Sequence, residues 1–173
     1  MHTNPLITGA LAVVATTSLI GLGGAADAAE PTTTRERGIV IECSGEHRGR
    51  PVYTSVYENN TVKNSVQILV GDDDRQVGGN RESAAPFRTG KQVHAAARIG
   101  GSRAVIDGTA RAVGRKTLVH EEHADAGELI TIDGTHRRLR TALTLAWRGR
   151  VVPLDCAESF VYDLQVTHES AVD

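Results

Sequence analysis

The chain has 173 residues, of which 40% are hydrophobic and only 3% aromatic, and its 19 basic and 21 acidic residues give a net charge of −2 at pH 7. This balance predicts neither a nucleic-acid-binding protein nor a membrane-surface binder, because both classes depend on an excess of Lys and Arg. The length suits one domain with a substantial core.

The N-terminal segment predicts export. Residues 6–22 form an apolar stretch typical of a signal-peptide core, and the sequence Ala-Asp-Ala at 26–28 places small residues where signal peptidase cleaves. We therefore expect a signal peptide over residues 1–28, a secreted, extracellular domain, and no membrane contact after cleavage. Because no Lys or Arg precedes the apolar stretch, a transit segment or an anchored form is the alternative.

Residues 29–38 are polar and include Pro31, so they predict a flexible leader. From residue 39 onward apolar and polar residues alternate, which is typical of half-buried β-strands, and we find no amphipathic helix longer than a turn or two. We therefore expect a single β domain over residues 39–170. The expected strands are 38–43, 51–58, 65–70, 93–99, 102–113, 116–124, 128–133, 138–147, 151–156 and 160–169.

One stretch breaks the alternation. Residues 71–90 have no steady period and are rich in Gly, Asp, Arg and Ser, so they predict one long loop. Loops of this length in small domains are commonly functional or mobile. Most other strands are separated by tight-turn sequences such as Gly100-Gly101 and Asp133-Gly134.

The only cysteines, Cys43 and Cys156, predict one structural disulfide, because an exported chain folds in an oxidising compartment. Cys43 alternates with Ile41, and Cys156 with Leu154, so both sulfurs are expected on apolar faces of adjacent strands. An antiparallel meander that closes into a barrel of about 8–10 strands brings the first strand beside one near the end of the chain. The alternatives are a two-sheet β-sandwich and two free buried cysteines.

Several residues expected to face the interior are small, and they could either leave a cavity or permit tight packing. These residues are Ala95, Ala97, Ala104, Ala110 and Ala112. The available aromatic contacts for a small apolar or ring-bearing ligand are Tyr53, Tyr57, Trp147 and Phe160, which we therefore predict as ligand-binding residues. A filled core that contains the same side chains is the alternative.

The segment VHEEHADAG at 119–127 concentrates potential metal ligands, but it is not the HExxH motif. On a strand His120 shares a face with Glu122, and a metal site would need a further ligand such as His94 or His136. We favour a solvated strand end, with no metal or other cofactor.

The sequence also lacks GxSxG and SxxK motifs, and a disulfide leaves no free thiol as a nucleophile. A small barrel enzyme, such as an isomerase, cyclase or hydrolase, would require two of five titratable residues to converge in a cleft. The five are His94, His120, His136, Glu122 and Asp163.

The segments VYENN, VHEEHADAG, ITIDG and VPLDC carry a resemblance to an uncharacterised family of small secreted actinobacterial β proteins with no known activity. The resemblance implies a bacterial origin and no particular functional residue. We therefore expect a secreted, non-catalytic β-barrel that binds a small apolar molecule or an extracellular protein, and no nucleic acid. The barrel enzyme and a metal-handling protein are the alternatives.

Overall fold

The computed structural model describes residues 30–170, which form an all-β domain whose strand pairs are all antiparallel. The predicted signal peptide lies outside the described residues. Between residues 30 and 170 there is no α-helix, and no helix long and apolar enough to span a membrane. The strands are β1 (Thr32–His47), β2 (Arg50–Asn59), β3 (Asn64–Val70), β4 (Val77–Ser83), β5 (Arg88–Thr89), β6 (Gln92–Ile99), β7 (Ser102–Ala112), β8 (Thr117–Asp125), β9 (Glu128–Trp147) and β10 (Arg150–Ser170).

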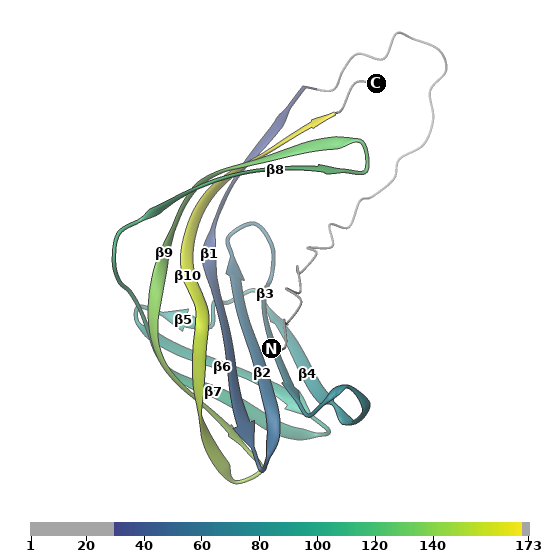
Figure 1. Ribbon diagram of the computed structural model, residues 1–173, viewed down its shortest axis with the longest axis vertical. Coiled ribbons are helices and arrows are strands. Elements are labelled where there is room, and N and C mark those ends of the chain that lie inside the picture. Colours follow the sequence, from purple (N-terminus) through teal and green to yellow (C-terminus); the bar gives the residue numbers. More distant parts are fainter. Residues whose placement is uncertain (1–29, 171–173) are drawn as a thin grey trace, which may run out of the picture.

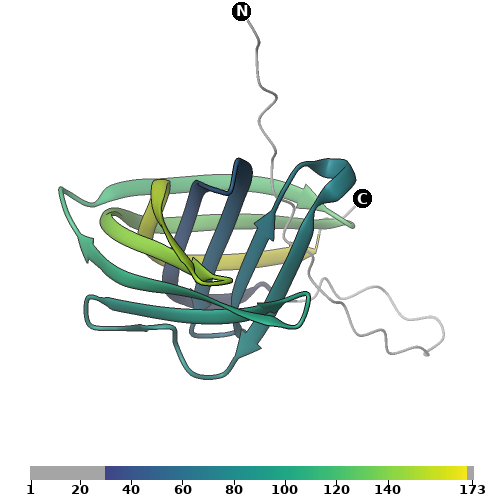
Figure 2. The same cartoon turned by 90° about the horizontal axis from the view of Figure 1, so that it is seen from below.

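All ten strands belong to one sheet with the order β4-β3-β2-β1-β10-β9-β7-β6-β5, and β8 pairs with β9 beside this path. The sheet curls into a half-barrel, so that β4 approaches β6 without a ladder of hydrogen bonds between them (Figures 1 and 2). The approach is close at Gly79, where an added Cβ would collide with the backbone of Arg98. The predicted antiparallel barrel-like fold is confirmed, and the sandwich alternative is not.

The interior of the half-barrel is apolar because alternate residues of each strand face it. On β2, for example, Val52, Thr54 and Val56 are buried, whereas Tyr53 faces outward. Four of the small residues lie in this core and are almost fully buried: Ala95, Ala97, Ala104 and Ala110. In this part of the barrel the small side chains therefore serve tight packing rather than a cavity.

Beyond the barrel four strands continue as a twisted arm, which consists of residues 32–37 of β1, 163–170 of β10, 128–136 of β9 and all of β8 (Figure 1). The expected flexible leader is therefore wrong for residues 32–38. These residues are extended because β10 supplies their hydrogen-bonding partners, with Thr32 opposite His168.

The expectation of one long loop over residues 71–90 is also wrong. A 3-10 turn (Asp73–Arg75) is followed by β4, which pairs with β3 along its whole length, and then by the short β5. β4 is an edge strand whose residues are nearly all exposed on both faces. A strand without a buried face has no apolar alternation, and this explains why the sequence pattern missed it.

β9 and β10 are each continuous where the sequence pattern predicted two strands. Gly134 does not form a tight turn but lies within β9 opposite Leu164, where an added Cβ would collide with the backbone of β10. In β10 the register shifts between Leu154 and Phe160, which is a β-bulge. Because of this bulge, Leu154 and Val161 both pack toward the core although their spacing in a regular strand would place them on opposite faces.

Cys43 and Cys156 form the predicted disulfide between β1 and β10, with their Cα atoms 3.9 Å apart. Cys43 is buried in the core, and Cys156 packs against it. The bridge and the β1–β10 ladder therefore join the two ends of the domain side by side, as the alternation around each cysteine predicts.

The double variant Cys43→Ala/Cys156→Ala should be less stable than the wild type by about 2–5 kcal/mol, the usual effect of removing a native disulfide that closes a long loop. The sequence separation of this bridge is 113 residues. Urea unfolding with and without reductant measures the effect. Reductant should destabilise only the wild type, and a double variant as stable as the oxidised wild type would contradict a stabilising role.

Candidate functional site

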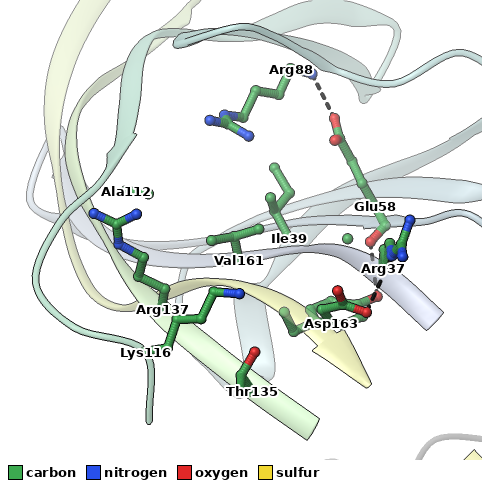
Figure 3. A pocket seen from close by; sticks show the side chains of 12 residues that line it. Arg37, Ile39, Glu58, Arg88, Ala112, Lys116, Thr135, Arg137, Val161 and Asp163 are labelled. Carbon is green, nitrogen blue, oxygen red and sulfur yellow. Dashed lines mark hydrogen bonds and ion pairs between the residues drawn. The ribbon is translucent and has the colours of Figure 1, made fainter. Parts of the chain in front are cut away.

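A cavity of about 450 Å³ lies inside the half-barrel at the end where the arm begins (Figure 3). The base of this cavity is apolar, since Ile39 on β1, Ala112 on β7 and Val161 on β10 occupy interior positions of their strands. Of the five small residues expected to face the interior, Ala112 is the one that lines this cavity. Here the interior is not filled by side chains, in contrast to the core below it.

Charged side chains surround this apolar base. Four basic residues and two acidic residues line the cavity, and they come from strands far apart in the sequence (Figure 3). The basic residues are Arg37, Arg88, Lys116 and Arg137, and the acidic residues are Glu58 and Asp163.

Asp163 is already engaged by two arginines of β1. Its carboxylate accepts two hydrogen bonds from Arg35, each 2.8 Å long, and a third from Nε of Arg37 at 3.2 Å. These partners hold the pKa of Asp163 well below its usual range, chiefly through the hydrogen bonds from Arg35. The same contact raises the pKa of Arg35. Asp163 is therefore an ionised carboxylate, and its negative charge is neutralised by the two arginines of β1.

Glu58 lies at the end of β2 and is half-buried. Its carboxylate accepts a hydrogen bond of 2.5 Å from the backbone N–H of Arg88, shown as a dashed line in Figure 3. Burial raises the pKa of Glu58, although the backbone hydrogen bonds from Arg88 and Phe87 and the charge of Arg88 oppose the change. Glu58 thus positions the segment that carries Arg88, and its environment disfavours the ionised carboxyl.

The other basic groups of the cavity form no ion pair with an acidic residue of the described chain. Arg88, Lys116 and Arg137 form no salt bridge with any residue between 30 and 170. Nε of Arg88 is buried and has no hydrogen-bond partner among residues 30–170. The end of the Arg88 guanidinium extends into the cavity (Figure 3). Nε of Arg137 donates to the backbone carbonyl of Gly114 at 3.0 Å, so that the wall opposite Arg88 is held in place.

The four predicted ligand-binding residues are not brought together, and none of them lines this cavity. Tyr57 and Phe160 lie on the outer face of the sheet on either side of Tyr162, with ring centroids 6.4 Å from it in both cases. Tyr53 also faces outward and is 38% exposed, whereas Trp147 is buried in the core against His47. Their role as ligand contacts stays a prediction, but they do not form one site.

The five residues named for a barrel enzyme are likewise dispersed. His94 pairs with Asp107, and His136 packs against Phe160. His120 contacts Asp133 and, on the same face as expected, lies 3.9 Å from Glu122 on the exposed arm. Of the five, only Asp163 lines the cavity.

A metal site finds no support in the ligand positions. Within residues 30–170 there is no group of three or more His, Cys, Asp or Glu residues placed to hold a metal ion. Asp133 raises the pKa of His120 through a hydrogen bond, which favours the charged imidazolium and not the neutral ring that a metal requires.

Sequence reasoning named Asp163 but missed the other charged residues of the cavity, although two of these leave a signal. Glu58 continues the buried alternation of Thr54 and Val56, and Arg37 continues that of Ile39. A charged residue on an apolar face near a strand end indicates a polar opening in the interior. Arg88 and Lys116 have no comparable signal, because Arg88 lies in a strand of two residues and Lys116 lies outside the strands, so that neither belongs to an alternating pattern.

Comparison with known proteins gives little further guidance. No protein-family model matches the chain, and no curated protein matches it. A solved structure from Nitrosomonas europaea, described provisionally as an AttH, aligns with a TM-score of 0.30 and 11% identity over 80% of this chain. The alignment covers 52% of that protein, so this chain spans about half of its length. At this TM-score the similarity supports no argument about function.

Glu58→Gln should change how stability depends on pH. Burial raises the pKa of Glu58 above its ordinary value of 4.5. The protonated carboxyl therefore stabilises the fold at a pH below 4.5, and this contribution is lost as the pH rises through the raised pKa. Gln does not titrate and can still accept the Arg88 N–H. The variant should therefore gain stability relative to the wild type as the pH rises from 4.5 to 7.5 in urea unfolding.

Glu169→Gln supplies the matched control, because it removes one acidic side chain at an exposed position, where burial has no part. A difference between Glu58→Gln and the wild type that does not vary with pH would contradict the effect of burial on Glu58.

Proposed function

We propose that the protein is a secreted bacterial β-barrel without catalytic activity that binds a small molecule in the cavity at the arm end of the barrel. One observation carries the proposal: an otherwise filled apolar interior opens into a cavity of about 450 Å³. This volume lies within the range of about 300–1,000 Å³ typical of small-molecule sites. The mouth of a β-barrel is a common place for such a site.

The composition of the cavity wall supports binding of a small molecule. Ile39, Val161 and Ala112 offer an apolar surface, and a few polar groups are arranged around them. Ligand sites commonly combine these two features, because the apolar surface supplies affinity and the polar groups fix orientation. The Cys43–Cys156 bridge is consistent with secretion, since disulfides persist in oxidising compartments.

A barrel enzyme is the second candidate, and Glu58 is the observation in its favour. A half-buried carboxyl with a raised pKa beside an arginine is a feature of acid–base sites. However, no histidine of the described chain lines the cavity, and the other carboxylate, Asp163, is occupied by Arg35 and Arg37. The cavity therefore favours binding over catalysis.

Filling the cavity should abolish binding. We expect the uncharged fluorescent probe N-phenyl-1-naphthylamine to bind the wild type, and Ala112→Trp to weaken binding by about tenfold or more, since the indole would occupy the apolar base. Fluorescence titration measures both affinities. The control Val62→Trp places the same residue at a position that is 57% exposed, and it should bind the probe like the wild type.

Circular dichroism establishes whether each variant is folded. If Ala112→Trp does not fold, Thr135→Trp tests the same cavity from β9. A folded cavity variant that binds the probe as tightly as the wild type would overturn the proposal, as would a wild type that does not bind it.

A further inference from the structure

We infer that the cavity selects an organic carboxylate, whose charged group contacts Arg88 and whose apolar body packs on Ile39 and Val161, while Lys116 adds positive charge to the same cavity. This inference rests on the proposed function and adds the chemical class of the ligand. It follows from the charges around the cavity, from the buried Nε of Arg88, and from the separation of apolar and basic surfaces within one volume.

The cavity has an excess of positive charge. Four basic groups face two acidic groups around the cavity, and Asp163 is already paired with Arg35 and Arg37. Glu58 accepts the backbone N–H of Arg88, and burial disfavours its ionised form. Within residues 30–170 no carboxylate pairs with Arg88 or with Lys116, so their charges are available to a ligand.

The guanidinium of Arg88 has an unpartnered Nε. This atom is buried and has no hydrogen-bond acceptor among the described residues, although a buried charged donor is costly to leave unsatisfied. A guanidinium is always protonated and presents parallel N–H donors that match the two oxygens of a carboxylate. The terminal N–H groups of Arg88, which extend into the cavity, would donate to a bound carboxylate, because no carboxylate of the described residues forms a salt bridge with this guanidinium (Figure 3).

The cavity also combines two kinds of surface, one apolar and one basic. Three of the four basic side chains approach from β5, from the residue before β8 and from β9, while Arg37 of β1 pairs with Asp163 (Figure 3). Ile39 of β1 and Val161 of β10 supply the apolar base. An inorganic anion would use only the basic part and leave the apolar base uncovered. A molecule that has a hydrocarbon or aromatic body and one carboxylate uses both parts, and we assign this class to the site.

Displacement of N-phenyl-1-naphthylamine by decanoate and by decanamide tests the assignment, since these two molecules share the hydrocarbon chain and differ in charge. Decanoate should displace the probe from the wild type at about tenfold lower concentration than decanamide, the effect of one charge-assisted hydrogen bond. Arg88→Gln should remove most of this preference and leave decanamide unaffected. Lys116→Gln, at an exposed position, provides a second variant if Arg88→Gln does not fold.

Arg140→Gln is the matched control, because Arg140 is exposed and lines a separate groove on the outside of the sheet beside Phe160. If Arg140→Gln lost the preference for decanoate and Arg88→Gln kept it, the placement of the carboxylate beside Arg88 would be wrong. Equal displacement by decanoate and decanamide would overturn the carboxylate assignment while probe binding still supports the proposed function. Inorganic phosphate that displaces the probe as well as decanoate would also overturn the assignment. A wild type that binds no probe would overturn both proposals.

Discussion

The antiparallel pairing of β1 with β10 is the interaction on which the rest of this structure depends. It extends from Thr32 opposite His168 to Ser44 opposite Asp155, so the first and last strands lie at the centre of the sheet and not at its edges. Forming it brings together segments far apart in the sequence, at a cost in loop entropy that a disulfide between the same strands offsets. Within the barrel the free edges lie instead at β4 and at β5, where the curled sheet turns toward itself (Figure 2), and in the arm β8 is a further edge strand.

The bulge in β10 determines what faces the interior at the arm end. Without it, the alternation that buries Leu154 would bring Phe160 inward and fill the space with an aromatic ring. With one extra residue, Val161 and Asp163 face inward and Phe160 packs outside against His136. The interior position of Asp163 is tolerated because arginines of the paired strand β1 hydrogen-bond to it. The interior therefore has a polar opening at the arm end, and not a filled core, because of one bulge in β10.

Local alternation of residues was sufficient to predict the antiparallel barrel-like fold and the Cys43–Cys156 bridge, since both depend on which residues of each strand are apolar. It could not predict the position of Phe160, because a bulge reverses the faces without a distinctive sequence signal. Nor could it predict β4, which is exposed on both faces. Local alternation could not predict the cavity for a different reason. Arg88, Lys116 and Arg137 line one opening only because long-range strand pairing places their segments around it.

Burial affects the acidic and the basic side chains of the cavity differently. It disfavours the ionised form of Glu58 and so raises its pKa, whereas an arginine stays protonated wherever it is buried. Because water is partly excluded, the charge of Arg88 is also less screened than it would be on the surface. The potential inside the cavity is therefore more positive than the ratio of basic to acidic side chains suggests. This bias arises from the shape of the barrel as much as from its composition, because the same residues on an open sheet would be hydrated and nearly independent of one another.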